Sequence, residues 1–373
     1  MTNSQDIKEE SKTQRLRSTI ALALVISPIL GIVLIYLSGI SQQWVNPDKP
    51  KVTRPVHVIS ADWYDLYFTR IDAESTWKDG IDQQLANDIS NAQSSIDVAA
   101  YSLDISILID ALVDAHERGL QVKLIIEADN STSDQLSRLP DAGILVVTDD
   151  RSGTMHNKFV VIDQAIVWTG SWNMTYMGTY RNYNHAIRIQ SVRLAENYVA
   201  EFNEMYEEGQ FGKTSTKGVP HPTLALDGSN VETLFSPEDR IMDRIIDLVE
   251  NAKQSIHFMA MSFTHDDLGQ AMIQRFKDGL KVEGVFESHG AGAQASEYTK
   301  LKQAGVPVWR ETSDARMHNK VLVVDQSIVM LGSFNLSQSA DQYNDENVLI
   351  IHDRELAQHF IDEMNLIVAT SHP

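Results

Sequence analysis

The chain contains one module twice, and this repetition constrains the fold more than any other feature of the sequence. The tetrapeptide MHNK occurs as residues 155–158 and again as residues 317–320. Longer segments align at the same offset of about 160 residues, among them NAQSSIDVAAYSLD at 91–104 and NAKQSIHFMAMSFT at 251–264. Self-similarity over this distance indicates one structural unit used twice. We therefore expect two similar modules.

Each copy shows the pattern of alternating helices and strands. Apolar residues at i, i+4 and i+8 predict a helix over residues 81–89 and its counterpart over 241–249. Ser236, followed by a proline and two acids, is typical of the start of this second helix. Strands are expected at 96–101 and 256–262. The apolar runs after each MHNK do not alternate with polar residues, so helices should cover both faces of the sheet. The predicted fold class is α/β, with two α/β/α sandwich modules.

The N-terminal region carries an apolar run at residues 20–40 that has no charged residue. As a helix it would be about 31 Å long, close to the thickness of a bilayer core. The apolar part of a signal peptide, the alternative interpretation, is usually shorter, about 7 to 15 residues. Basic residues precede the run, which favours a cytoplasmic N-terminus and a single-pass membrane protein with an extracytoplasmic catalytic part. A soluble mature form beginning near residue 41 would instead indicate a signal peptide.

These features predict a division of the chain into six regions. The segment at 212–230 is rich in Gly, Pro, Ser and Thr and therefore predicts a linker between the modules. The predicted regions are a cytoplasmic tail (1–19), a transmembrane anchor (20–40), a juxtamembrane segment (41–70), a first module (71–211), the linker (212–230) and a second module (231–373).

Composition excludes some kinds of chemistry and disfavours others. The chain has no cysteine, which excludes disulfides, thiolate zinc sites and cysteine nucleophiles. Its formal net charge of -20 argues against an extended groove for nucleic acid, because such grooves attract the phosphate backbone with basic residues. A local basic pocket remains compatible with this charge.

The repeated tetrapeptide places the same two functional groups in each module. Residues i and i+2 of a strand point to the same face, so His156 lies beside Lys158, and His318 beside Lys320. One isolated H-x-K would be a common surface feature, but two at matching positions indicate a function. Each copy also carries an aspartate five residues after the lysine and a G-S-x-N tetrapeptide further on, which adds Asp163, Asp325, Ser171, Asn173, Ser333 and Asn335.

These residues resemble the signature of the phospholipase D superfamily, H-x-K-x4-D followed by G-S-x-N. Both copies are complete, as HNKFVVID with GSWN and as HNKVLVVD with GSFN. The resemblance covers about residues 60–373. It implies two α/β/α modules related by a pseudo-twofold axis, with both motifs meeting in one active site. The implied reaction is phosphodiester cleavage through a phosphohistidine, without a metal or another cofactor.

The resemblance also implies roles for the site residues. One histidine attacks phosphorus while the other protonates the leaving alkoxide. Lys158 and Lys320 bind the phosphate oxygens, with help from the serines and asparagines of the two G-S-x-N tetrapeptides. For Asp163 and Asp325 a structural role is at least as plausible as a catalytic one, because strand parity points them to the opposite face.

A difference between the copies assigns the two histidines. Family members often carry a glutamate that supports a histidine, and here the second copy has Glu346 where the first has Asn184. If each supports the histidine of its own copy, the carboxylate makes His318 the acid and leaves His156 to attack. The alternative is that Glu346 supports a basic nucleophile.

The sequence thus favours hydrolysis of phospholipid phosphodiester bonds, with phospholipid and the membrane as partners. An apolar anchor would hold the site close to its lipid substrate. A nuclease of the same superfamily is the alternative, since GSFNLSQSADQYNDEN looks similar to the small nuclease and mitochondrial cardiolipin hydrolase branch. A phosphate-binding scaffold without turnover is least consistent, because every His, Lys, Ser and Asn of both motifs is intact.

Overall fold

A computed structural model describes residues 56–71, 79–149, 151–216, 218–313 and 315–371. The predicted cytoplasmic tail and transmembrane anchor lie outside these residues. Within them, no helix has the length and apolar character needed to cross a membrane.

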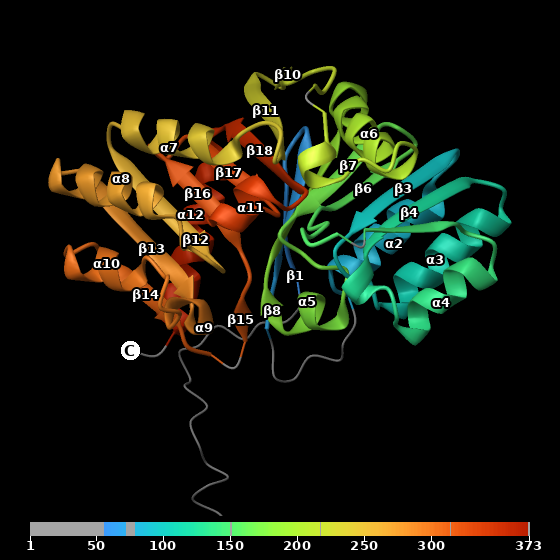
Figure 1. The fold of residues 1–373 in the computed structure, drawn as a ribbon, viewed down its shortest axis with the longest axis horizontal. Coiled ribbons are helices and arrows are strands. Elements are labelled where there is room, and N and C mark those ends of the chain that lie inside the picture. The colour runs from blue at the N-terminus through green and yellow to red at the C-terminus, as the bar shows by residue number, and fades with distance from the viewer. Residues whose placement is uncertain (1–55, 72–78, 150, 217, 314, 372–373) are drawn as a thin grey trace, which may run out of the picture. The chain divides into compact units, whose positions relative to one another are not determined.

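Two similar modules make up the described chain, each built on an eight-stranded sheet (Figure 1). The first sheet has the order β1-β2-β9-β7-β6-β3-β4-β5 and the second the order β10-β11-β18-β17-β16-β12-β13-β14. In each sheet the last three strands are parallel and the others antiparallel. The predicted two-module α/β architecture is confirmed.

The elements of the first module follow the alternating pattern expected from the sequence. They are β1 (Val56–Ser60), β2 (Tyr64–Thr69), α2 (Ile81–Asn91), β3 (Ser95–Ala100), α3 (Ser106–Glu117), β4 (Gln121–Glu127), η1 (Ala128–Asn130), α4 (Asp134–Asp141), β5 (Val146–Asp149), β6 (Lys158–Ile162), β7 (Ile166–Gly170), α5 (Tyr176–Tyr180), β8 (Asn182–Tyr183), β9 (His185–Gln190) and α6 (Val192–Tyr206).

The second module repeats this order with small insertions. After η2 (Gly212–Thr214) come β10 (Thr223–Leu226), β11 (Ser229–Ser236), α7 (Ile241–Asn251), β12 (Ser255–Ala260), α8 (Asp266–Lys277), β13 (Lys281–Glu287), α9 (Ser288–Ala291), α10 (Tyr298–Gln303), β14 (Val308–Glu311), β15 (Arg316–Met317), β16 (Lys320–Val324), β17 (Ile328–Gly332), α11 (Gln338–Gln342), β18 (Glu346–His352) and α12 (Arg354–Thr370).

Both sheets extend further along the chain than the sequence predicted. Strands β1 and β2 lie within the segment expected to be juxtamembrane, and β2 buries Leu66 and Phe68 in the core. Strand β10 and the start of β11 lie within the expected linker. The predicted helix start at Ser236 is also wrong, because this residue ends β11 and its hydroxyl donates to two backbone carbonyls, while α7 begins at Ile241. Strands β1 and β10 end their sheets, while β2 and β11 pair with the distant strands β9 and β18, so the position of these strands depends on tertiary pairing rather than on local pattern.

A shared hydrophobic core joins the two modules. Helix α6 contacts strands of the first sheet and also β11 of the second, and α12 contacts strands of the second sheet. Tyr198 of α6 packs edge to face with Phe235 of β11 at 5.3 Å between ring centroids, and Phe360 of α12 packs on Phe68 of β2 at 5.3 Å. Burial of each such ring contributes about 1.5–3 kcal/mol. Helices α2 and α3 pack in one outer core and α7 and α8 in another, whereas α6 and α12 contribute to the core that both modules share.

The two aspartates of the sequence motifs bind the backbone of loops that lie far from the histidines. Asp163 accepts hydrogen bonds of 2.7–3.2 Å from the backbone N–H groups of residues 93–95. Asp325 accepts equivalent bonds of 2.6–3.0 Å from residues 253–255. Each aspartate follows a five-residue strand that begins at the motif lysine, about 16 Å away at 3.3 Å per residue. Both side chains therefore make structural contacts away from the histidines, which favours the structural one of the two roles expected from the sequence.

Replacing Asp163 or Asp325 by alanine should lower stability and spare the chemistry. We expect a loss of about 1–2 kcal/mol in the free energy of unfolding, because three backbone donors lose their shared acceptor. Denaturant titration measures this loss, and kcat of the folded variants should stay within about twofold of the wild-type value. A loss of more than about a hundredfold in kcat by a folded variant would instead indicate that the aspartate takes part in catalysis.

The contribution of Asp163 to the free energy of unfolding should also depend on pH. Burial alone would raise the pKa of Asp163, but the hydrogen bonds from residues 93–95 outweigh it and lower the pKa below the usual value. A carboxyl whose pKa is lowered by folding stabilises the fold above its unfolded pKa, near 3.9, and this contribution is lost as pH falls through the folded pKa. The stability difference between wild type and the Asp163→Ala variant should therefore shrink in acid.

Candidate active site

Backbone pairing between the modules brings the two MHNK copies together. Met155 forms a parallel bridge with Asp345, and the N–H of His156 donates to the carbonyl of Asp345 at 2.9 Å. In the reciprocal contact, Met317 pairs with Tyr183, whose carbonyl accepts from the N–H of His318 at 2.9 Å. Each histidine therefore enters the site alongside a strand of the opposite module.

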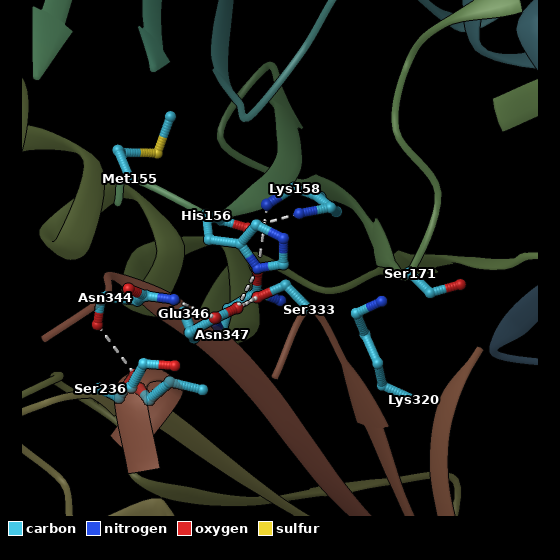
Figure 2. Close-up of polar contacts among 12 residues, drawn as sticks. Met155, His156, Lys158, Ser171, Ser236, Lys320, Ser333, Asn344, Glu346 and Asn347 are labelled. Atoms are coloured by element: carbon cyan, nitrogen blue, oxygen red, sulfur yellow. Dashed lines mark hydrogen bonds and ion pairs between the residues drawn. The ribbon is translucent and has the colours of Figure 1, made fainter. Parts of the chain in front are cut away.

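The imidazole rings are held by side chains of the opposite module. Nδ1 of His156 is hydrogen-bonded to Oε2 of Glu346 at 2.7 Å (Figure 2). Nδ1 of His318 bonds to Oδ1 of Asn184 at 2.9 Å and to the carbonyl of Ser171 at 3.0 Å. The expectation that Glu346 and Asn184 support the histidines of their own copies is wrong. The backbone pairing explains why, because the residue after Asp345 is thereby placed beside His156.

Both motif lysines are buried, and each donates to the carbonyl of the neighbouring histidine. Nζ of Lys158 bonds to His156 O at 2.8 Å, and Nζ of Lys320 to His318 O at 3.0 Å. Burial lowers the pKa of Lys320 to about 7, although Glu346 acts in the opposite direction. Burial also lowers the pKa of Lys158 well below its usual range. An ammonium has three N–H groups, so two on each lysine remain available to an anion.

The motif serines hold the partners of the histidines. Ser171 donates to Oδ1 of Asn184 at 2.9 Å, and Ser333 donates to Oε2 of Glu346 at 2.6 Å. Each serine oxygen also accepts a backbone N–H, and both side chains are fully buried. These contacts favour a positioning role for the two hydroxyls over the phosphate-binding role expected from the sequence.

The glycine of each G-S-x-N tetrapeptide allows this arrangement. Gly170 and Gly332 have φ of +146° and +148°, which favours glycine. A Cβ at Gly170 would lie 2.4 Å from the carbonyl oxygen of His185, and one at Gly332 would lie 2.1 Å from that of Asn347. The sequence signature thus includes a backbone requirement in addition to its polar side chains.

The asparagines of the two tetrapeptides remain candidates for phosphate binding. Asn173 and Asn335 are half-buried, and the Oδ1 atom of each is buried without a hydrogen-bond partner among the described residues. No hydrogen bond involves either amide nitrogen in the described part of the chain. These two groups are therefore placed to donate to an oxyanion.

Sequence reasoning missed two residues around His156. The Tyr101 ring lies 4.9 Å from the His156 ring in an edge contact, and Nζ of Lys158 lies 4.9 Å from the Tyr101 centroid. Asn344 donates to Oε1 of Glu346 at 3.1 Å, which leaves this carboxylate with bonds on both oxygens (Figure 2). Tyr101 stands where the aligned second copy has Met261, a difference that the alignment could have shown.

The charges of the site suit a phosphodiester. Burial and the nearby lysines lower the pKa of His156 and of His318 well below the usual range, which makes both rings neutral at pH 7. Because the pKa values of Lys320 and Glu346 lie near 7, both groups can take up a proton when an anion binds, and each proton adds one positive charge to the site. This property suits the single negative charge of a phosphodiester. The arrangement can bind a phosphate group between two neutral imidazoles.

Comparison with known proteins agrees with this geometry. A family model described as cardiolipin synthase, PLD-like domain, matches residues 85–206 and 245–368. The chain belongs to this PLD-like family. A phospholipase D of Rickettsia prowazekii is 34% identical over 136 residues, covering 36% of this chain and 66% of the relative. A mitochondrial cardiolipin hydrolase of Chlamydomonas reinhardtii is 25% identical over 175 residues, covering 40% of this chain and 78% of the relative.

A solved structure extends the likeness across both modules of this PLD-like chain. The phosphatidylserine synthase of Haemophilus influenzae superposes with a TM-score of 0.64 at 16% identity, covering 86% of this chain and 89% of that chain. This likeness concerns the fold.

Binding of an oxyanion should be accompanied by uptake of protons. Burial places the pKa of Lys320 at about 7 and raises that of Glu346 to about 7, while a bound anion favours the protonated form of both groups. Sulfate does not titrate near neutral pH, so its affinity should fall as pH rises above about 7. Calorimetry in buffers of different ionisation enthalpy should show net proton uptake at pH 8, and less in the Lys320→Met variant. Proton release, or an affinity that rises with pH, would contradict this electrostatic description.

Proposed function

We infer that the protein is a phospholipase D-type phosphodiesterase that hydrolyses phospholipid phosphodiester bonds. The observation that carries this inference is the pair of imidazoles, each oriented through Nδ1 from the opposite module, beside two buried lysines. With Nδ1 engaged, Nε2 of each ring is free for chemistry. The names of the relatives, phospholipase D and cardiolipin hydrolase, support a phospholipid substrate.

The proposed reaction has two steps that share the two histidines. Nε2 of His156 attacks phosphorus and forms a P–N bond, while the P–O bond to the leaving alcohol breaks and His318 gives that oxygen a proton. Water then attacks the phosphohistidine. His318, now neutral, takes a proton from this water as the P–N bond breaks, which releases phosphatidate and restores both rings.

Glu346 supports the choice of His156 as the nucleophile. Attack converts a neutral ring into a phosphorylated imidazolium, and a carboxylate on Nδ1 stabilises this developing positive charge. His318 is held by neutral acceptors, the Asn184 amide and a backbone carbonyl, so its protonated ring transfers a proton more readily. The assignment matches that expected from the sequence, but its reason differs, because the carboxylate belongs to the nucleophile.

The lysines and asparagines are proposed to bind the phosphate oxygens. Lys158 and Lys320 offer charged donors in a site from which water is largely excluded, where such donors stabilise transition-state charge strongly. Asn173 and Asn335 would add neutral donors. A bound anion would also favour protonation of His318, which provides the proton that the leaving alkoxide requires.

The apolar run at residues 20–40 is proposed as an anchor that keeps the catalytic modules at a bilayer surface. The length of the run and the basic residues before it support this proposal. An anchored enzyme meets lipid at a high effective concentration, which favours phospholipid over nucleic acid as substrate. The net charge of -20 supports the same choice.

A direct comparison of substrates tests the proposed function. The full chain in vesicles, with EDTA present, should release the head-group alcohol from labelled phospholipid and leave single-stranded DNA intact. His156→Asn and His318→Asn should each lower kcat by at least about a thousandfold, because neither ring can replace the other. Cleavage of DNA without cleavage of any phospholipid would establish the nuclease alternative. Activity above about a tenth of wild type in either variant would contradict a two-histidine site.

A further inference from the structure

A cluster of three glutamates lies outside the active site, where the two modules meet. Glu201 and Glu204 project from α6 of the first module, and Glu238 follows β11 of the second. One carboxylate oxygen from each lies within 4.8 Å of the other two. The three residues line a cavity of about 120 Å³. Carboxylates from both modules therefore converge on one cavity.

Two oxygens of this cluster are buried without a partner. Glu201 is 3% exposed, and its Oε1 has no hydrogen-bond partner among the described residues. Oε2 of Glu238 is likewise buried and has no hydrogen-bond partner among these residues. The described lining also includes Glu208 and Asp239. A buried carboxylate without a partner is costly unless a proton or a cation compensates it.

We propose that Glu201, Glu204 and Glu238 bind a divalent cation of the calcium type. Calcium takes oxygen ligands at 2.3–2.6 Å, so atoms around one ion lie up to about 5 Å apart, compatible with this cluster. Its flexible coordination accepts three carboxylates from two chain segments, with water filling the remaining positions of the cavity. Magnesium binds most often through one or two carboxylates in a strict octahedron, which fits this set less well.

Protons are the competing occupants of the cluster. Burial raises the pKa of both Glu201 and Glu238 above the usual range of a glutamate, and the neighbouring carboxylates act in the same direction. A metal ligand must be deprotonated, so calcium has to displace these protons. Affinity for calcium should therefore increase from pH 7 to pH 9, and binding should release protons.

The position of the cluster gives the cation a structural role. Ser236, two residues before Glu238, donates to the carbonyl of Asn344, and the Asn344 amide donates to Glu346 (Figure 2). A cation bound by α6 and by the turn after β11 would fix this turn against the first module. The calcium proposal is tested independently of the proposed reaction, because calcium binding is measured without substrate.

Calcium titration of the full chain in detergent, after removal of metal with EDTA, tests the proposal. Wild type should bind about one calcium per chain, more tightly at pH 9 than at pH 7, and calcium should raise its unfolding temperature. The Glu201→Gln/Glu238→Gln double variant keeps the side-chain shapes and should lose at least about a hundredfold in affinity. Glu250→Gln removes an exposed charge from α7 and should bind as wild type does.

The Glu201→Gln/Glu238→Gln double variant, measured without metal, provides a control for folding. In EDTA at pH 8 the double variant should unfold at or above the wild-type temperature, because neutral amides remove the repulsion between buried carboxylates. If the double variant fails to fold, the half-buried Glu204→Gln alone should weaken calcium binding by at least about tenfold. The proposal is overturned if wild type binds no calcium at about 10 mM, a concentration that fills even weak sites. Equal binding by the glutamine variants and wild type would also overturn it.

Discussion

The active site depends on one reciprocal interaction, the backbone pairing of each MHNK segment with a strand of the opposite module. Met155 pairs with Asp345 and Met317 with Tyr183, so the residue that follows each partner, Glu346 or Asn184, contacts a histidine of the other copy. The shared core around α6 and α12 keeps these strands in register. One module alone would contain a histidine without its orienting partner, which explains why the chain carries the module twice.

The charged side chains of the site are arranged to bind the phosphate anion of a substrate. The chain as a whole carries a formal charge of -20, yet Lys158 and Lys320 are both buried, with Glu346 as a carboxylate that acts on both. Burying two ammonium groups is unfavourable, and it becomes less so when a phosphate enters between them. The difference between Glu346 and Asn184 then gives the two histidines different roles. A carboxylate stabilises positive charge on one ring, and an amide orients the other without adding charge.

The sequence predicted the parts of this structure that follow from local pattern. Helix α2 and strand β3 are close to their expected bounds, because apolar spacing reports directly on helix and strand faces. Asp163 lies at the far end of β6 from Lys158, consistent with the expectation that it points away from the site, but His156 precedes the strand, so strand parity does not account for its position. Cross-module partners were not predictable, because they depend on how two sheets dock. For the same reason Ser171 appeared available for phosphate, whereas its hydroxyl is used to hold Asn184.

Locating the covalent intermediate is the most direct test of the composite site. A reaction with a phospholipid labelled in its phosphate, quenched under conditions that preserve phosphohistidine and then digested, places the label on one peptide. The geometry predicts label on the peptide containing His156, whose ring is held by Glu346 from the other module. Label on the peptide containing His318, with none on that of His156, would contradict the assignment.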